Sequence, residues 1–199
     1  LAVRAAAGTG FKAPSFYALG NPLVGNSALL PERSASGELG LDWSSDNGVN
    51  ASLTMFRARY TDLIDFDPGP PLQLVNRSEV ESNGVSAAFA DSMGDRLTIR
   101  ATTQRIETSD QRGAPLLNRP VWRASAALDW AATRRLRIRL TDSYTSARQD
   151  FSIPTGVREL DVYHRVAVQA TVALSPATTM RLIVDNALDS DHEDAVGFP

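Results

Sequence analysis

Apolar and polar residues alternate over unusually long stretches of this sequence. Every second residue from Trp122 to Trp130 is apolar, and residues 135–141 alternate arginines with aliphatic side chains. Because successive side chains of a β-strand point to opposite faces, this period predicts strands with one apolar and one polar face. We expect strands at 1–8, 34–45, 49–66, 72–92, 96–108, 120–131, 135–149, 158–174 and 178–187.

The connections between these strands alternate between short and long. In an up-and-down sheet every second connection lies at the same end, so one end carries turns and the other carries loops. Many of the strands also exceed the roughly 5–6 residues that are typical of a soluble sheet. Both features are typical of outer-membrane barrels, which have short periplasmic turns and longer extracellular loops. We expect short turns at 46–48, 93–95, 132–134 and 175–177, and longer links at 9–33, 67–71, 109–119, 150–157 and after residue 186.

The aromatic residues have the spacing of two membrane interfaces. Trp122 and Trp130 share a face and are separated by about 20 Å along the axis of a tilted strand. Trp43 and Phe89 lie on apolar faces beside short turns, whereas Tyr144 lies near a long link. These positions predict an aromatic girdle at each edge of a lipid-facing band. The alternative is a soluble β-sandwich whose core the aromatic residues fill.

The ends of the sequence and the strand count predict an internal fragment. Leu1 enters a strand pattern directly, without an initiator methionine or a signal peptide. A strand in lipid must pair all its backbone groups, and bacterial single-chain barrels have an even number of strands. We therefore expect the edges at 1–8 and 178–187 to pair with strands outside this sequence.

Composition excludes several other classes of protein. The chain has 199 residues, of which 43% are hydrophobic and 22% charged, with a net charge of -3, so a disordered chain and a basic nucleic-acid binder are both excluded. It has no cysteine and only His164 and His192 as imidazoles. We expect no enzyme, no cofactor and no metal site, and we interpret the acidic residues of 189–194 as a solvated loop.

Five sequence boxes, in order along the whole chain, resemble those of TonB-dependent outer-membrane receptors. Residues 8–22 resemble the family's "GFRAPS" box, and residues 25–34 resemble its "NPxLxPE" box, with Ser27 where proline is common. Residues 52–64 are similar to its "slFynrykdlI" strand. The "NvgrarsrGvE" region matches at 75–76 and 82–85, with Ser86 in place of an acidic residue. Residues 185–192 resemble "NLfDkdY", with His192 in place of tyrosine.

The resemblance implies an all-β fold, an antiparallel up-and-down transmembrane β-barrel segment. This segment would supply about nine strands, roughly the thirteenth to the twenty-first, of an expected 22-stranded barrel with a plug in its lumen. Residues 1–199 would then be the C-terminal part of the barrel domain, without the plug, the early strands and the last strand. The implied location is the outer membrane of a Gram-negative cell, in contact with its lipid.

The implied function is TonB-energised uptake of a scarce nutrient complex such as a ferric siderophore, haem or cobalamin. TonB would act through the absent N-terminal region. The alternatives are a passive porin-type channel and a soluble β-sandwich binding module. We expect five arginines on polar faces to line the lumen, where they bind plug carboxylates or guide an anionic ligand: Arg100, Arg137, Arg139, Arg165 and Arg181. The candidates for ligand contact in extracellular loops are Phe11, Phe16, Tyr17, Asn21, Arg77, Arg112, Arg119 and Arg158.

Overall fold

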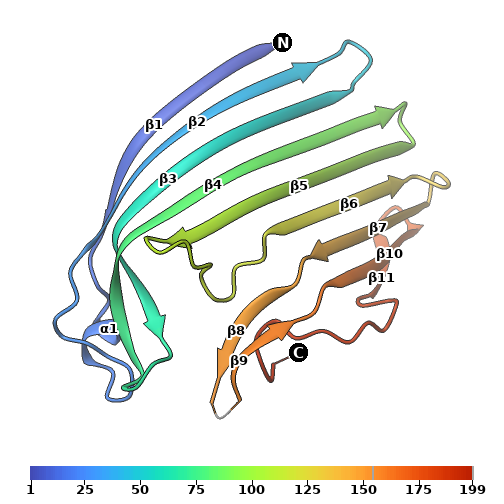
Figure 1. Cartoon of the computed structure of the whole chain (residues 1–199). Coiled ribbons are helices and arrows are strands. Elements are labelled where there is room, and N and C mark those ends of the chain that lie inside the picture. Colours follow the sequence, from blue (N-terminus) through green and yellow to red (C-terminus); the bar gives the residue numbers. More distant parts are fainter. Residues whose placement is uncertain (154, 199) are drawn as a thin grey trace.

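A single antiparallel sheet dominates the computed structural model, which describes residues 1–153 and 155–198 (Figure 1). Each strand pairs with the next along the chain, except that β7 pairs with β10. Pro154, in the predicted link 150–157, and Pro199 lie outside the described residues. In sheet order the strands are β1 (Ala2–Lys12), β2 (Glu32–Ser44), β3 (Asn50–Asp67), β4 (Gln73–Met93), β5 (Leu97–Asp110), β6 (Trp122–Trp130), β7 (Leu136–Thr145), β10 (Tyr163–Ser175) and β11 (Thr178–Val184).

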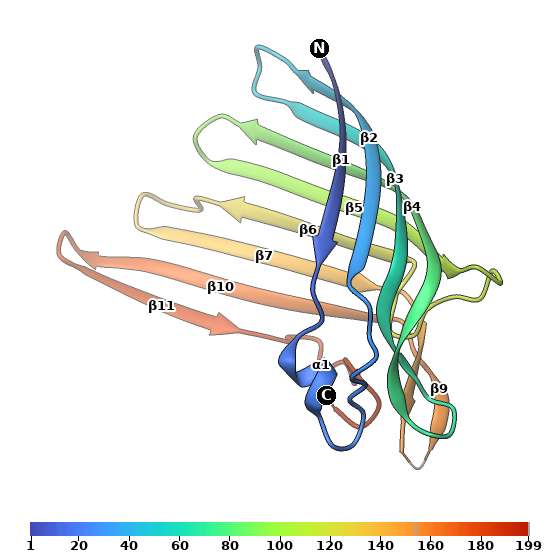
Figure 2. The ribbon, with the colours of Figure 1, turned by 90° about the vertical axis from the view of Figure 1, so that its left-hand side faces the viewer.

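The sheet is one curved layer, with tight turns along one end and long connections along the other (Figure 2). The extensive contacts between strands join neighbours within a sheet. Within the described ranges, no second sheet packs on the face that carries Leu136, Ile138, Val166 and Val168. The β-sandwich alternative is therefore wrong, and the up-and-down barrel segment is confirmed.

The register divides the side chains into the two predicted faces. Residues directly opposite one another in an antiparallel pair lie on the same face. Ile138 is opposite Trp130 and Ala170 on the apolar face, whereas the next residue, Arg139, is opposite Asp129 and Gln169 on the polar face. Because the side-chain period of a strand is two, one such row fixes the faces of the neighbouring residues wherever the register is unbroken, as it is not between Ala173 and Ser175 of β10.

Two boundaries differ from the prediction. The link expected at 150–157 is mostly a separate hairpin of β8 (Arg148–Ser152) and β9 (Gly156–Leu160), which form their own two-stranded sheet. Neither element alternates regularly, so the pattern predicted a link over 150–157 and assigned only the outer ends of β8 and β9 to the neighbouring strands. The predicted loop 9–33 is also shorter, because β1 continues to Lys12 and pairs with Glu32.

In the described ranges, no helix has the length and apolar character needed to cross a membrane.

Gly84 of β4 allows an aromatic ring to lie across the backbone. It is opposite Phe56 of β3 on the polar face. A Cβ at this position would lie 2.3 Å from Cζ of Phe56 and 2.9 Å from the backbone oxygen of Arg105. The ring therefore covers a strand glycine, a packing that stabilises an otherwise weak position in a sheet.

Gly84→Val in the complete protein is therefore expected to lower the free energy of unfolding by about 1–3 kcal/mol through overpacking. Urea unfolding in lipid bilayers measures the change. Gly37→Val is the matched control, because the nearest atom to a Cβ there is the Ala6 oxygen at 3.9 Å. Equal urea midpoints for the two variants would contradict the packing argument.

Candidate functional site

The β1–β2 connection contains a short helix, α1 (Phe16–Gly20), that presents aromatic side chains to solvent. Ser15 caps it, since its Oγ accepts a hydrogen bond from the Ala18 amide at 3.1 Å. Asn21 ends it, and its Oδ1 accepts hydrogen bonds from two amides further on in the loop. Phe16 is 95% exposed and Tyr17 is 64% exposed. Exposed aromatic rings on a capped turn are suited to contact a bulky ligand.

This connection is attached to the tip of the β3–β4 hairpin, and together they form the first loop cluster (residues 13–31 and 62–77). The Leu74 amide donates to the Val24 oxygen at 2.7 Å, and Asn26 donates to the Leu74 oxygen at 3.0 Å. Asn76 accepts from the Leu30 amide at 2.8 Å and donates to the Leu30 oxygen at 3.0 Å. The long hairpin therefore supports the otherwise irregular loop.

Glu32 is the buried carboxylate at the base of this cluster. Its Oε1 accepts a hydrogen bond from the Ile64 amide at 3.1 Å and forms an ion pair with Lys12 at 3.2 Å. Glu32 is only 8% exposed, so these two partners offset the cost of burying its charge. Glu32 therefore links the loop ends of β1 and β2 to β3.

Arg148 is the centre of a second loop cluster, which combines the β5–β6 loop, the β8–β9 hairpin and residues 186–198. Its side chain is 3% exposed. The guanidinium donates to Asn118 Oδ1 at 2.9 Å and to the backbone oxygens of Glu193 and Asp194 at 2.9 and 2.8 Å. It also lies 5.8 Å from the ring of Tyr163. One side chain thus joins three connections that are distant in sequence.

A small apolar core surrounds this arginine. Leu116, Leu160 and Val196 come from the three different connections and are 8%, 2% and 6% exposed. The Val196 amide donates to Asp150 at 3.0 Å, which ties the C-terminal segment to the hairpin. Sequence analysis did not identify Arg148 or this core, because alternation does not show which loops meet in space.

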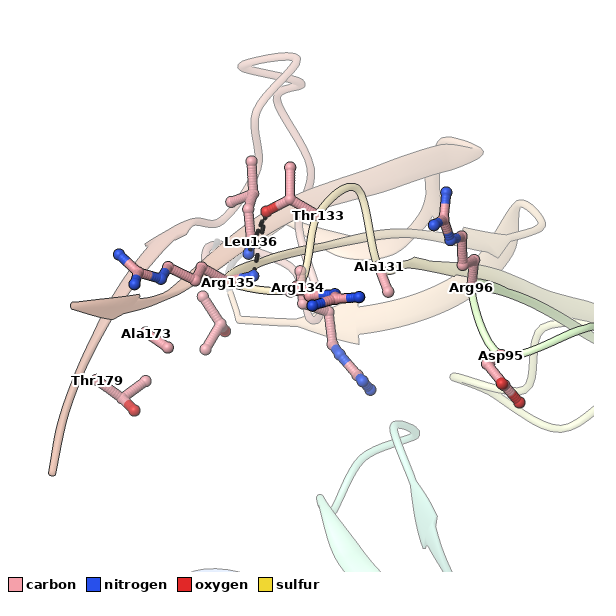
Figure 3. Close-up of a pocket in the computed structure, with 11 residues that line it drawn as sticks. Asp95, Arg96, Ala131, Thr133, Arg134, Arg135, Leu136, Ala173 and Thr179 are labelled. Atoms are coloured by element: carbon pink, nitrogen blue, oxygen red, sulfur yellow. Dashed lines mark hydrogen bonds between the residues drawn. The ribbon is translucent and has the colours of Figure 1, made fainter. Parts of the chain in front are cut away.

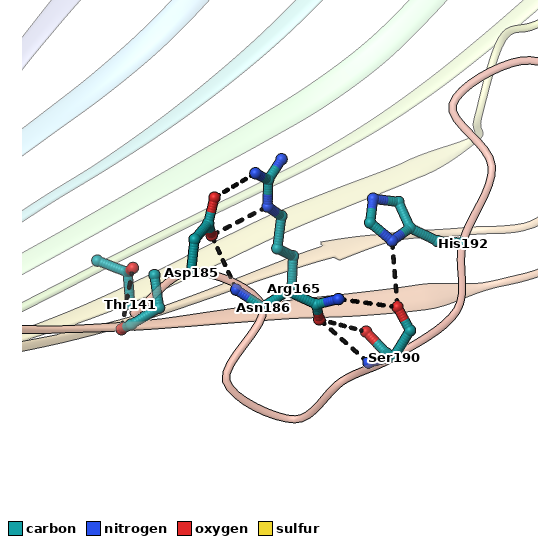
Figure 4. A network of polar contacts seen from close by, with 7 residues as sticks. Thr141, Arg165, Asp185, Asn186, Ser190 and His192 are labelled. Atoms are coloured by element: carbon teal, nitrogen blue, oxygen red, sulfur yellow. Dashed lines mark hydrogen bonds and ion pairs between the residues drawn. The ribbon is translucent and has the colours of Figure 1, made fainter. Parts of the chain in front are cut away.

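The segment after β11 is held by polar contacts at the loop end of β10 (Figure 4). Asn186 and Ser190 exchange hydrogen bonds at 3.1 Å, and the Ser190 hydroxyl donates to the backbone oxygen of His164 at 2.6 Å. Arg165 and Asp185 form an ion pair beside them. This arrangement directs the chain from the sheet toward the second loop cluster.

The predicted ligand-contact residues are divided between the two clusters. Phe16, Tyr17 and Asn21 lie in the first, where Arg77 donates to Asp65 and to the Phe66 oxygen, each at 3.3 Å. The carboxylate and the carbonyl therefore occupy this guanidinium, which leaves the exposed aromatic rings as the better candidates for contact in this cluster.

The other candidates are spread over the remaining connections. Arg158 lies 3.4 Å from Glu193 in the second cluster, and Arg119 donates to the Asn118 oxygen at 3.3 Å. Arg112 lies in the β5–β6 loop. Phe11 lies within β1 rather than in a loop, on the apolar face opposite Arg33. The structure therefore does not bring the eight candidates together at one point.

The tip of the β5–β6 loop is organised by a carboxylate. Asp110 Oδ1 accepts hydrogen bonds from the Arg112 and Ala114 amides at 2.8 and 3.0 Å. These bonds, first that from Ala114, lower the pKa of Asp110 below its ordinary value. A lowered pKa means that the loop is stabilised above about pH 4 and that this stabilisation is lost as the pH falls through the folded-state value.

We therefore expect amide protection of Arg112 and Ala114 in the complete protein to fall between roughly pH 5 and pH 2. Hydrogen exchange, corrected for the intrinsic pH dependence, measures it. Asp110→Asn keeps an acceptor oxygen but does not titrate in this range, so its protection should be independent of pH. The same pH dependence in both proteins would show that another group is responsible.

The five predicted girdle residues share the apolar face. Trp43 and Phe89 lie in one row with Ala51. Trp122 and Trp130 lie at opposite ends of β6 on that face, and Tyr144 joins them from β7 through its pairing with Ala124. The three tryptophans and Phe89 are half-exposed in the chain by itself, as expected for side chains that contact lipid, and Tyr144 is partly exposed.

All five predicted lumen arginines lie on the opposite, polar face. Asp129 accepts from Arg100 at 2.8 Å and from Arg139 at 2.6 Å. Arg137 and Arg181 lie in one row on either side of Thr171. Arg165 pairs with an aspartate beyond β11. Carboxylates thus neutralise part of this face but leave a cationic remainder at its turn end.

A single curved sheet with an apolar band, a polar inner face, tight turns at one end and loops at the other defines a segment of an outer-membrane β-barrel. Residues 1–187 match the family described as "TonB dependent receptor-like, beta-barrel". The chain belongs to this family of outer-membrane receptors and transporters. It is therefore part of a Gram-negative outer-membrane protein and not an enzyme.

Relatives with different cargo are similar to this chain. The vitamin B12 transporter BtuB of Vibrio cholerae is 26% identical over 209 residues, which cover 99% of this chain and 32% of BtuB. The iron-regulated outer membrane virulence protein of V. cholerae is 26% identical over 225 residues, covering 95% of this chain and 33% of the relative. The chain thus spans about a third of their length.

Solved structures give the same fold. The siderophore receptor PirA from Acinetobacter baumannii superimposes with a TM-score of 0.74 at 20% identity, over 94% of this chain and 34% of PirA. At this identity the likeness establishes the fold alone.

Proposed function

We propose that this chain forms about nine strands of the 22-stranded barrel of a receptor that imports a scarce nutrient complex with energy delivered through TonB. Residues 1–199 are the C-terminal part of that barrel, and β1 and β11, the two edges of the sheet, pair with strands outside the chain. Pairing is required because an open edge in lipid leaves backbone groups without hydrogen bonds.

The observation that carries this proposal is the combination of two opposite faces with two organised loop clusters at one end. A passive pore needs the faces, but it does not need extracellular loops fastened by a buried arginine and a buried glutamate. Here Arg148 and Glu32 hold those loops in fixed positions. Fixed loops support a binding surface because they lower the entropy lost on binding.

The proposed cargo is a ferric siderophore, haem or cobalamin. The similarity to a vitamin B12 transporter and to a siderophore receptor supports this class. Phe16 and Tyr17 would contact the bulky ligand, and Arg112 and Arg119 would contact anionic groups. A plug would fill the lumen and face the arginines of the polar side.

Uptake by cells that express the complete protein tests the proposal. Radiolabelled cyanocobalamin, ferric enterobactin and haemin serve as probes, in strains with and without TonB. We expect saturable binding of one probe, and uptake of that probe only when TonB is present. Uptake that is linear with concentration and independent of TonB would instead identify a porin-type channel.

A further inference from the structure

The curved sheet carries a recess on each of its two faces. The recess on the polar face, about 410 Å³, is lined by arginines of the β6–β7 turn and lies on the lumen side (Figure 3). The recess on the apolar face, about 630 Å³, extends from β3 to β10 and is open toward the hydrocarbon of the membrane. The apolar-face residues that line this lipid-side recess are Ala51, Ala87, Phe89, Ala101, Thr103, Ala124, Ala126, Asp142, Tyr144 and His164.

Small side chains form the floor of the lipid-side recess. Two neighbouring rows of the register supply them: Ala87, Thr103 and Ala124 in one, and Ala51, Ala101 and Ala126 in the other. Phe89 borders the floor near the turn end of β4, and Tyr144 borders it near the loop end of β7. The recess therefore runs between the two aromatic girdles, where an acyl chain can contact the floor along its length.

A titratable pair lies at the loop end of this recess. Nδ1 of His164 is 3.2 Å from each carboxylate oxygen of Asp142. The register places His164 opposite Tyr144 and Asp142 opposite Val166, so both belong to the lipid-facing side. Ionisable side chains on that side are costly unless a polar group meets them. The pair therefore indicates a polar ligand group at this depth, near the outer girdle.

The rim around this pair presents hydrogen-bond donors. The imidazole ring of His164 lies 5.0 Å from the ring of Tyr144, whose hydroxyl can donate. Asp142 engages the imidazole through Nδ1, and Nε2 has no hydrogen-bond partner among the described residues. Nε2 is thus the atom that remains for an external acceptor, to which it donates when the ring is protonated.

An arginine on the same face extends this donor set. Arg105 is opposite Trp122 in the register, and its guanidinium lies 5.9 Å from the indole ring. Trp122 is two residues from Ala124, which is opposite Tyr144. The ion pair of Arg105 with Glu107 joins two half-exposed side chains, and such pairs contribute little. The guanidinium can therefore exchange Glu107 for a phosphate, which it binds more specifically.

We propose that the lipid-side recess binds one phosphorylated lipid of the outer leaflet. An acyl chain lies along the alanine floor, and the phosphate accepts hydrogen bonds at the rim from Tyr144, His164 and Arg105. Lipid is the occupant because the recess is continuous with the lipid-facing band and opens at the level of the outer head groups. This role goes beyond nutrient uptake, since it requires neither a plug nor TonB.

Native mass spectrometry of the complete protein in detergent tests the site by titration with three probes. Dioleoyl phosphatidic acid has both acyl chains and phosphate, dioleoylglycerol has only the chains, and glycerol phosphate has only the phosphate. We expect the first molecule of phosphatidic acid to bind about tenfold more tightly than dioleoylglycerol. Glycerol phosphate should not bind, because it has no chain to fill the recess.

Two substitutions test the two halves of the site. Ala126→Leu fills the floor and stays apolar toward lipid, so it should weaken binding of phosphatidic acid about tenfold without harming the barrel. Ala170→Leu, the same change on the same face outside the recess, is its matched control. His164→Phe keeps a ring but removes the donor, and should reduce the preference for phosphatidic acid over dioleoylglycerol. His192→Phe, in the second loop cluster, should keep that preference.

Four results would overturn the proposal. Equal binding of phosphatidic acid by Ala126→Leu and Ala170→Leu would show that no chain occupies the recess. Equal binding of phosphatidic acid and dioleoylglycerol would show that the rim does not recognise phosphate. Binding of glycerol phosphate as tight as that of phosphatidic acid would identify a site for free phosphate. A lipid-free dimer that Ala126→Leu dissociates would show that a second copy of the protein covers this face.

Discussion

Arg148→Ala in the complete protein is expected to release the second loop cluster while the sheet stays intact. The substitution removes charged hydrogen bonds to Asn118 and to the Glu193 and Asp194 oxygens, and it leaves these acceptors without that donor. Charged hydrogen bonds of this kind contribute about 1.5–3 kcal/mol each, so opening of the cluster should become at least a hundredfold more frequent. Hydrogen exchange at the Val196 amide, bonded to Asp150, measures the opening.

Two variants isolate the geometry of this arginine. Arg148→Lys keeps a positive charge but not the planar fork that reaches three acceptors, so it should rescue protection only partly. Arg158→Ala removes an exposed arginine 3.4 Å from Glu193 and should change exchange little. Unchanged exchange in Arg148→Ala would show that the apolar core of Leu116, Leu160 and Val196 suffices without it.

Leu53→Arg is expected to destabilise the complete barrel by about 2 kcal/mol, whereas Ser52→Arg should be nearly neutral. Leu53 lies on the apolar face in a row with Leu41 and Ala87, so an arginine there faces hydrocarbon. Ser52, one residue earlier, lies opposite Asp42 on the polar face, where a guanidinium remains in water and gains a carboxylate partner.

Urea-dependent unfolding from lipid bilayers measures both substitutions, and each changes the charge equally on adjacent residues of β3. The comparison therefore depends only on which face meets lipid. A larger loss of stability for Ser52→Arg than for Leu53→Arg would reverse the assignment of the faces, and with it the lumen position of the arginines.

Much of the sheet could be predicted from the sequence because a strand in a barrel has one neighbour on each side and two simple environments. The alternation around Leu136 and Arg137 depends only on the period of two. The short turns were predicted where one alternating stretch ends and the next begins. The prediction was wrong at β8 and β9 because neither strand alternates regularly, so periodicity gives no sign of the separate hairpin that they form.

The candidate site was less predictable. The sequence suggested exposed aromatic rings, and Phe16 and Tyr17 are indeed exposed on α1, although their contact with ligand stays a prediction. The loop partners were not predictable, because the Leu74–Val24 hydrogen bond joins segments about 50 residues apart that share no pattern. The same holds for Arg148, which looks in the sequence like another polar-face arginine.

The sequence alone determined the strands of the main sheet, the two faces, the family resemblance and the alternation of turns with loops, since each depends on residues close together along the chain. The tertiary structure decided which loops are fastened together, which arginines keep an unneutralised charge, and that Phe11 belongs to a strand. These properties depend on registers and on loop contacts between distant segments, and both are fixed only when neighbouring strands pair and the loops pack against one another.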